Sequence, residues 1–150
     1  MKIHVISVGK PSKNFVNIIN FYKDKCSKYH KILLHHTKDV KIKDKQKKIQ
    51  KEEESILNIV KNGLLCALDE KGVNFDTPAF SKFINKKINA ARDIYFIIGG
   101  AYGLSEHIKN NADIKIRLSD MVMQHDIALT VLLEQIYRSL TILKGIPYHK

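Results

Sequence analysis

Several features that would assign a protein to a familiar class are absent from this sequence of 150 residues. No apolar run approaches the length of a membrane span, and the run from Ile3 to Val8 is too short for the core of a signal peptide. No glycine-rich loop ends in Gly-Lys-Ser or Gly-Lys-Thr, and no dinucleotide fingerprint follows the first expected strand. These absences argue against membrane proteins, secreted proteins and the common NAD and ATP enzymes, and we expect a cytoplasmic protein.

Cysteine is scarce, and nothing in the composition divides the chain. Cys26 and Cys66 are far apart and lack the close pairing of a zinc or redox motif, so we expect reduced, buried cysteines and no structural metal. The chain has no linker, repeat or low-complexity tract, and its length suits one core. Residues 1–150 are therefore expected to form a single domain.

Acidic residues are outnumbered, with 15 Asp and Glu against 26 Lys and Arg, which gives a formal net charge of +11. Such an excess favours a polyanionic partner, because phosphate neutralisation releases counterions. RNA, DNA and an anionic membrane all remain open. All but three of the basic residues are lysine, so part of the excess is also consistent with a lysine-rich genome.

Short apolar runs alternate with segments of helical periodicity, which predicts an α/β fold: a mostly parallel sheet covered by helices on both faces. Strands are predicted at residues 3–8, 32–36, 64–68, 94–98 and 114–117. Helices are predicted behind Ser12, over residues 52–62, behind Asp76, behind Ser105 and over residues 126–144. A solvated basic loop over residues 38–51 leads into the second of these helices, and a polar turn is predicted at 69–74. In such folds ligands bind beyond the carboxyl ends of the strands.

The last helix, Asp126 to Lys144, is apolar around most of its circumference. A helix of this kind must be buried on more than one side. One small sheet does not cover it, so we expect a two-fold homodimer in which a second copy covers the remaining apolar face. The alternative is a monomer with the helix deep in its own core.

Three segments carry residues that fit a ligand or a reaction. The turn from Gly99 to Leu104 follows a strand and lets backbone approach a ligand closely, although it also suits a simple tight turn. The irregular segment from Leu118 to His125 places Met121 and Met123 where they form either a wall for a flat ring or ordinary core.

The third segment is the end of the chain. Thr130, Glu134, Arg138 and Thr141 form a polar stripe on the last helix, which fits either an intrahelical ion pair or an arginine aimed at substrate. The terminal Tyr148-His149-Lys150 combines groups suited to base stacking, proton transfer and phosphate contact.

Taken together, the Gly99-Gly100-Ala101-Tyr102-Gly103-Leu104 turn, the Glu134-Gln135-Ile136-Tyr137-Arg138 run and the Pro147-Tyr148-His149 end closely resemble the RlmH family. Its members are bacterial large-subunit rRNA pseudouridine N3-methyltransferases. The resemblance covers the whole chain. It implies the SPOUT fold, with a deep trefoil knot near the carboxyl terminus, which is a rare exception to unknotted topology.

The resemblance also implies a cofactor and a substrate. S-adenosylmethionine would be held by Leu68, Gly100, Ser119, Asp120, Met121, Val122, Met123 and Gln124, in a dimer whose two halves together form each active site. The substrate would be N3 of a pseudouridine in large-subunit (23S) rRNA, on the assembled ribosome. His149 is the expected proton acceptor, Tyr148 would position the base, Arg138 would stabilise negative charge on the ring, and Glu134 would orient Arg138.

Two departures from the family pattern are Gln124, where proline is usual, and Leu129, where arginine is usual. The first predicts a less rigid cofactor loop, and the second removes a cation near the substrate. Two alternatives stay open: an RNA-binding knot protein without catalysis, and a knotted methyltransferase acting on tRNA.

Overall fold

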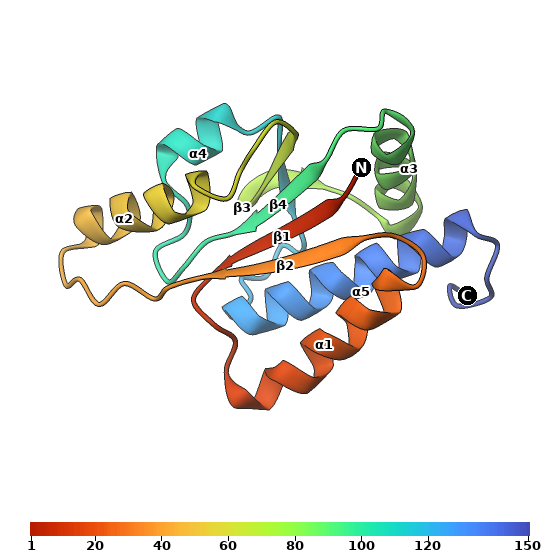
Figure 1. Cartoon of the computed structure of the whole chain (residues 1–150), viewed down its shortest axis with the longest axis horizontal. Coiled ribbons are helices and arrows are strands. Elements are labelled where there is room, and N and C mark those ends of the chain that lie inside the picture. Colours follow the sequence, from red (N-terminus) through yellow and green to blue (C-terminus); the bar gives the residue numbers. More distant parts are fainter.

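The computed structural model describes residues 1–150 as an alternating series of strands and helices. The strands are β1 (Ile3–Val8), β2 (Ile32–Thr37), β3 (Leu64–Asn74), β4 (Ile94–Ile98) and β5 (Ile114–Arg117). The helices are α1 (Lys13–Ser27), α2 (Lys45–Leu57), α3 (Thr77–Asn89), α4 (Glu106–Asn111) and α5 (His125–Leu143). All paired strands are parallel, in the order β2-β1-β4-β3-β5 (Figure 1). The predicted parallel α/β sheet is confirmed.

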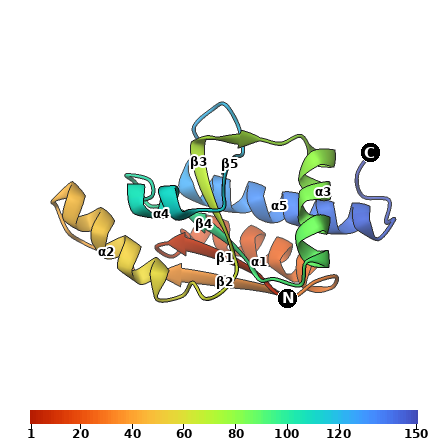
Figure 2. The same cartoon turned by 90° about the horizontal axis from the view of Figure 1, so that it is seen from above.

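Apolar side chains cover both faces of the central part of the sheet, which explains why β4 is an unbroken apolar run. On one face, Ile3 and Phe96 belong to the larger core, which α1, α3 and α5 complete. On the other face, Ile97 packs in a smaller core with Ile56 of α2 and Ile108 of α4. Successive side chains of a strand point to opposite faces, so a sheet covered on both sides needs apolar residues at every position. Figure 2 shows the same layers from above.

β3 is longer than its apolar run predicted. The sequence predicted that this strand ends at Leu68 and that a polar turn follows over residues 69–74, but the strand continues through that segment. Its register against β5 shifts after Leu68, and pairing resumes where Val73 faces Ile116. Gly72 permits the close approach, because a Cβ there would lie 2.6 Å from the Ile116 backbone nitrogen. The predicted turn was wrong because backbone pairing with β5 does not require apolar side chains.

α2 lies earlier in the chain than predicted, because the expected basic loop over residues 38–51 gives way to helix at Lys45. It begins at Lys45, where the Asp44 carboxylate accepts a hydrogen bond from the Lys47 backbone N–H at 2.8 Å. It ends at Leu57 rather than at Asn62, so the predicted carboxyl end was wrong by about one turn. The basic segment 38–44 precedes the helix as an extended, mostly exposed loop.

α5 is buried mainly by its own chain. It lies between α1 and α3 beneath the sheet, and Leu129, Leu132, Leu133 and Ile136 are fully buried. The covering that the apolar pattern assigned to a second copy is thus largely supplied by α1 and α3, as the monomeric alternative predicted. A strip of α5 stays accessible to solvent, and its residues are Ile127, Val131, Gln135, Arg138 and Ile142.

Cys26 and Cys66 are buried and unpaired, as the sequence predicted. Burial raises the pKa of the Cys26 thiol to about 12, so it stays protonated near neutral pH. No helix has both the length and the apolar character needed to cross a bilayer.

Candidate functional site

A cleft of about 720 Å³ opens at the carboxyl edge of the sheet. Its walls come from the end of β3, the turn after β4, the segment between β5 and α5, and the first turn of α5. This is the edge at which parallel α/β sheets bind ligands. Seven of the eight residues predicted to hold the cofactor line the cleft, namely Leu68, Gly100, Ser119, Met121, Val122, Met123 and Gln124.

Asp120 is the exception. Its carboxylate turns to Arg117 instead and makes an ion pair at 2.9 Å. Arg117 itself lines the cleft, so Asp120 reaches the wall only through this pair. The Arg117 Nε is buried and has no hydrogen-bond partner.

The glycine turn is shaped by close backbone packing. A Cβ on Gly99 would lie 2.6 Å from the carbonyl carbon of Gly103, whose φ of +76° favours glycine. The Gly103 N–H donates to the Gly100 carbonyl oxygen at 3.0 Å and closes the turn. The turn therefore presents backbone to the cleft, with Tyr102 half-exposed at its tip.

The segment after β5 forms the open side of the cleft. Met121 and Val122 are 79% and 83% exposed, so they are not core residues. Ser119 shapes the segment, since its hydroxyl accepts a hydrogen bond from the Met121 N–H at 3.0 Å. Gln124 caps α5, because its side-chain oxygen accepts from the N–H groups of Asp126 and Ile127 at 2.9 and 3.1 Å. In place of proline, Gln124 thus ties this segment to the helix by hydrogen bonds.

Asp126 anchors the amino end of α5 and was missed by sequence reasoning. Its carboxylate accepts the Ser12 backbone N–H at 3.0 Å and approaches His125 Nδ1 at 3.1 Å. Burial opposes its charge, but these hydrogen bonds hold the pKa of the Asp126 carboxyl below its usual value. Ser12 is the N-cap residue of α1, as the sequence predicted, although its side chain makes no cap hydrogen bond.

Glu52 of α2 is a second residue that the sequence analysis missed. Its side chain is only 4% exposed, and Oε1 has no hydrogen-bond partner. Both carboxylate oxygens would lie 3.0 Å from a Cβ on Gly100, so Glu52 packs directly behind the glycine turn. Burial raises the pKa of Glu52, although Lys48 at 3.9 Å opposes the shift. The available signal was a charged residue on the apolar face of its helix, four positions before Ile56.

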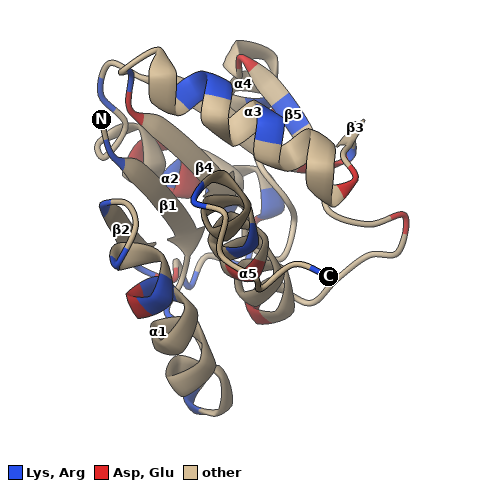
Figure 3. Cartoon of the chain, turned by 90° about the vertical axis from the view of Figure 1, so that its right-hand side faces the viewer, with Lys and Arg blue, Asp and Glu red and all other residues tan.

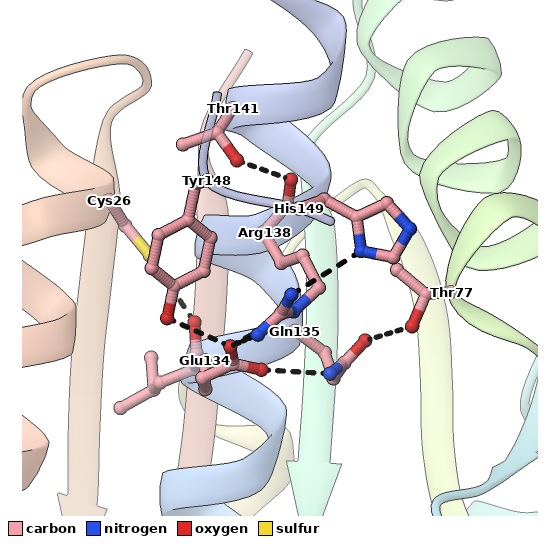
Figure 4. Close-up of polar contacts among 9 residues, drawn as sticks. Cys26, Thr77, Glu134, Gln135, Arg138, Thr141, Tyr148 and His149 are labelled. Atoms are coloured by element: carbon pink, nitrogen blue, oxygen red, sulfur yellow. Dashed lines mark hydrogen bonds and ion pairs between the residues drawn. The ribbon is translucent and has the colours of Figure 1, made fainter. Parts of the chain in front are cut away.

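A polar cluster gathers the four predicted catalytic residues at the far end of α5 (Figure 4). The Glu134 carboxylate accepts hydrogen bonds from Arg138 Nε and from the Tyr148 hydroxyl, both at 3.0 Å. The Arg138 guanidinium lies over the Tyr148 ring, 4.7 Å from its centroid, and Arg138 Nη1 lies 3.3 Å from His149 Nδ1. Gln135 donates to the other Glu134 oxygen at 2.8 Å.

Glu134 therefore serves two purposes in this cluster. It forms the intrahelical pair with Arg138, and it also fastens the end of the chain to α5. Its hydrogen bonds to the guanidinium raise the pKa of Arg138, and burial raises the pKa of Tyr148, so both stay protonated near neutral pH. The threonines of the predicted stripe take no part, because Thr130 and Thr141 donate to backbone carbonyls of α5.

His149 is the group in this cluster that can accept a proton. Because arginine only donates, His149 Nδ1 accepts the hydrogen bond from Arg138, which places the ring proton of the neutral imidazole on Nε2. The side chain of His149 is exposed, whereas Tyr148 packs edge-on against Tyr137 at 4.6 Å. The cluster can thus present a cation and an imidazole to a molecule that approaches from solvent.

The cleft and the polar cluster lie at different places along one helix. His125 lines the cleft at the first turn of α5, and Arg138 follows 13 positions later. At about 1.5 Å per residue, the two positions are roughly 20 Å apart along the helix axis. Figures 1 and 2 show α5 running across the molecule, with the C terminus near its carboxyl end.

Comparisons with known proteins agree with this geometry. The model of the family described as "Predicted SPOUT methyltransferase" matches residues 1–149. Proteins named ribosomal RNA large subunit methyltransferase H from Malacoplasma penetrans and Clostridium botulinum are 34% and 38% identical, each over the full length of both chains. The chain belongs to the methyltransferase H family of SPOUT methyltransferases.

Solved structures of methyltransferases share this fold. A candidate RNA methyltransferase from Bacillus anthracis superposes with a TM-score of 0.59 over 99% of both chains, at 16% identity. The SpoU methyltransferase AviRb from Streptomyces viridochromogenes superposes with a TM-score of 0.51 over 96% of this chain and 61% of its own, at 15% identity. The five-stranded parallel sheet with its helices is thus the SPOUT methyltransferase architecture.

Proposed function

We propose that this protein transfers the methyl group of S-adenosylmethionine to N3 of a pseudouridine in large-subunit rRNA, on the assembled ribosome in the cytoplasm. The support is its membership of the methyltransferase H family, together with a ligand cleft and a polar cluster built from the residues that such a reaction needs. We include in the proposal a single domain whose carboxyl-terminal part forms the deep trefoil knot of SPOUT proteins.

The cleft has properties that suit S-adenosylmethionine. Its volume of about 720 Å³ lies within the usual range of small-molecule sites, roughly 300–1,000 Å³. The backbone of the glycine turn and the segment 119–124 would hold the nucleoside, and Leu68 would pack against it. The cofactor supplies a methyl group made electrophilic by the sulfonium.

The distance between the cleft and the polar cluster is the main observation that supports an active site shared between two chains. A separation of roughly 20 Å along α5 prevents the tail of a chain from serving its own cleft. A second copy packed antiparallel on the accessible strip of α5 would bring its own tail to the cleft, and the converse would hold for its partner. We therefore propose a homodimer in which each active site uses the cleft of one chain and the tail of the other.

The chemistry follows from the groups in the cluster. The N3 proton of pseudouridine lies between two carbonyl groups, so its removal places negative charge on the ring oxygens. In the proposed reaction Arg138, held by Glu134, turns its donor from His149 Nδ1 to the ring oxygens and stabilises their charge, and the freed Nδ1 of His149 accepts the proton. Tyr148 orients the pseudouridine ring. Its raised pKa keeps the phenol protonated, so it is unsuited to accept the N3 proton. Alignment of N3 with the methyl group supplies the remaining acceleration.

The experiment that tests the activity is transfer of labelled methyl to ribosomes from a strain that lacks the enzyme. Label in large-subunit rRNA that maps to a pseudouridine supports the proposal, and His149→Ala should remove most of it. His107→Ala, which changes an exposed histidine of α4, is the matched control. Label only in tRNA would identify a different substrate. Neither label nor cofactor binding would leave an RNA-binding protein without catalysis.

A mixing experiment tests the shared active site. His149→Ala removes the proton acceptor, and Met123→Arg places a cation in the cleft. Mixed dimers of the two variants contain one intact pairing of cleft and tail. Activity that rises well above that of either variant supports a site shared between chains, whereas no recovery in demonstrated mixed dimers would place each site within one chain.

A further inference from the structure

The segment before α2, together with the first turn of that helix, carries an unusual set of unpaired charges. Residues 38–47, which we name the basic arm, contain five exposed lysines, Lys38, Lys41, Lys43, Lys45 and Lys47. No carboxylate lies within ion-pair distance of any of them. The two acids of the arm are engaged elsewhere, since Asp39 pairs with Lys48 at 3.5 Å and Asp44 caps α2. The arm thus presents a surface of positive charge that the chain itself does not neutralise.

The basic arm begins at the rim of the cleft. Lys45 lines the cleft, and its ammonium group lies over the Tyr102 ring, 5.4 Å from the centroid. Tyr102 is 48% exposed at the tip of the glycine turn and offers an aromatic surface on which a base can stack. From this point residues 38–44 lead away from the cleft at the end of the molecule opposite the C terminus (Figure 1).

We propose that the basic arm is a docking surface for the phosphate backbone of the RNA substrate, with Tyr102 stacking a base where the strand enters the cleft. The proposal rests on the proposed function for the identity of the RNA. Closely spaced lysines on an extended segment match the regular negative charges of a nucleic-acid strand, and they need no fixed geometry to do so.

The basic residues of α3 provide the comparison that makes the proposal specific. Lys82 and Lys86 of α3 are exposed and unpaired, and α3 lies on the side of the molecule that Figure 3 faces, where the C terminus also lies. Lys28, at the end of α1, is likewise exposed and without an ion pair. Replacing these three lysines changes the net charge as much as replacing three lysines of the arm.

The experiment compares Lys38→Gln/Lys41→Gln/Lys43→Gln with the control Lys28→Gln/Lys82→Gln/Lys86→Gln. Binding to large-subunit RNA is measured from 50 to 300 mM salt, alongside cofactor binding and methyl transfer. The arm variant should bind about tenfold more weakly, and the slope of log K against log salt should fall in magnitude by about 2. The KM for ribosomes should rise with little change in kcat, and cofactor affinity should stay at the wild-type value.

Other outcomes overturn the proposal. Equal losses in the arm and control variants would mean that net charge alone matters, and no loss in either would exclude the arm from RNA binding. Loss of binding to phosphatidylserine vesicles, with RNA binding unchanged, would assign the arm to a membrane surface instead. If the wild-type protein binds RNA through the arm but transfers no methyl group, the docking surface stands and the proposed function fails.

Discussion

Replacement of Gly100 by alanine tests whether Glu52 supports the glycine turn. The new Cβ would meet both carboxylate oxygens of Glu52 at 3.0 Å and Cγ1 of Val8 at 3.1 Å, closer than ordinary van der Waals contact. Overpacking of this kind costs about 1–3 kcal/mol. For a chain of this size, a loss of about 2 kcal/mol lowers Tm by about 4–8 °C. Cofactor affinity should fall as well, because the turn lines the cleft.

A double-mutant cycle distinguishes this clash from general damage to the turn. Glu52→Ala removes the carboxylate and should recover most of the stability that Gly100→Ala loses, giving a coupling energy of about 1 kcal/mol or more. Gly103→Ala is the control: its φ of +76° makes alanine unfavourable, but nothing lies near its Cβ position, so Glu52→Ala should recover none of its loss. Urea unfolding of each variant gives the energies. Additive losses for Gly100→Ala and Glu52→Ala would refute the proposed contact.

Three further predictions concern the polar cluster and four buried or partly buried histidines. Tyr148→Phe removes the hydrogen bond to Glu134 and should cost about 1 kcal/mol in urea unfolding, with cofactor affinity unchanged; equal stability would mean that the bond does not hold the tail. Arg138→Lys keeps the charge but loses the paired geometry, and kcat for methyl transfer should fall about 100-fold, whereas a near-normal kcat would remove Arg138 from the reaction. Burial lowers the pKa values of His4, His30, His35 and His36, so the folded state favours their neutral forms. Their contribution to the free energy of unfolding is complete above the unfolded-state pKa of about 6.5 and is lost as pH falls through the lowered pKa values of the folded state. The urea midpoint should therefore drop between pH 7.5 and 5. An unchanged midpoint would contradict this account.

The sequence predicted best the strands that are covered on both faces of the sheet and the helices that begin with a capping side chain. The run Ile94–Ile98 is apolar at every position because both faces of β4 are covered, and this pattern is readable without a structure. The Asp76 cap of α3 was equally readable, since its carboxylate accepts from the Ala79 N–H at 2.8 Å. Each signal is contained in a few neighbouring residues.

The features that could not be predicted depend on residues far apart in the chain. The second part of β3 exists because Val73 and Asn74 pair with β5, about 40 positions later. Asp126 is recognised only when the backbone of Ser12 is seen beside it, and Glu52 only when Gly100 is. Likewise, the residues expected to form one active site lie in two places, the cleft and the polar cluster. Spacing on a helix gives their separation along its axis, but it does not give the position of a second chain.

The order of the strands also has a consequence for how the chain folds as it is synthesised. β1 lies inside the sheet between β2 and β4, and its partner β4 begins 91 positions after Ile3. The larger core closes only when α5, the last helix, packs beneath β1 and β4. Contacts between such distant residues must overcome a large loop-closure entropy, which slows folding. The apolar side chains of β1, the first strand to leave the ribosome, therefore stay uncovered until nearly the whole chain has been synthesised.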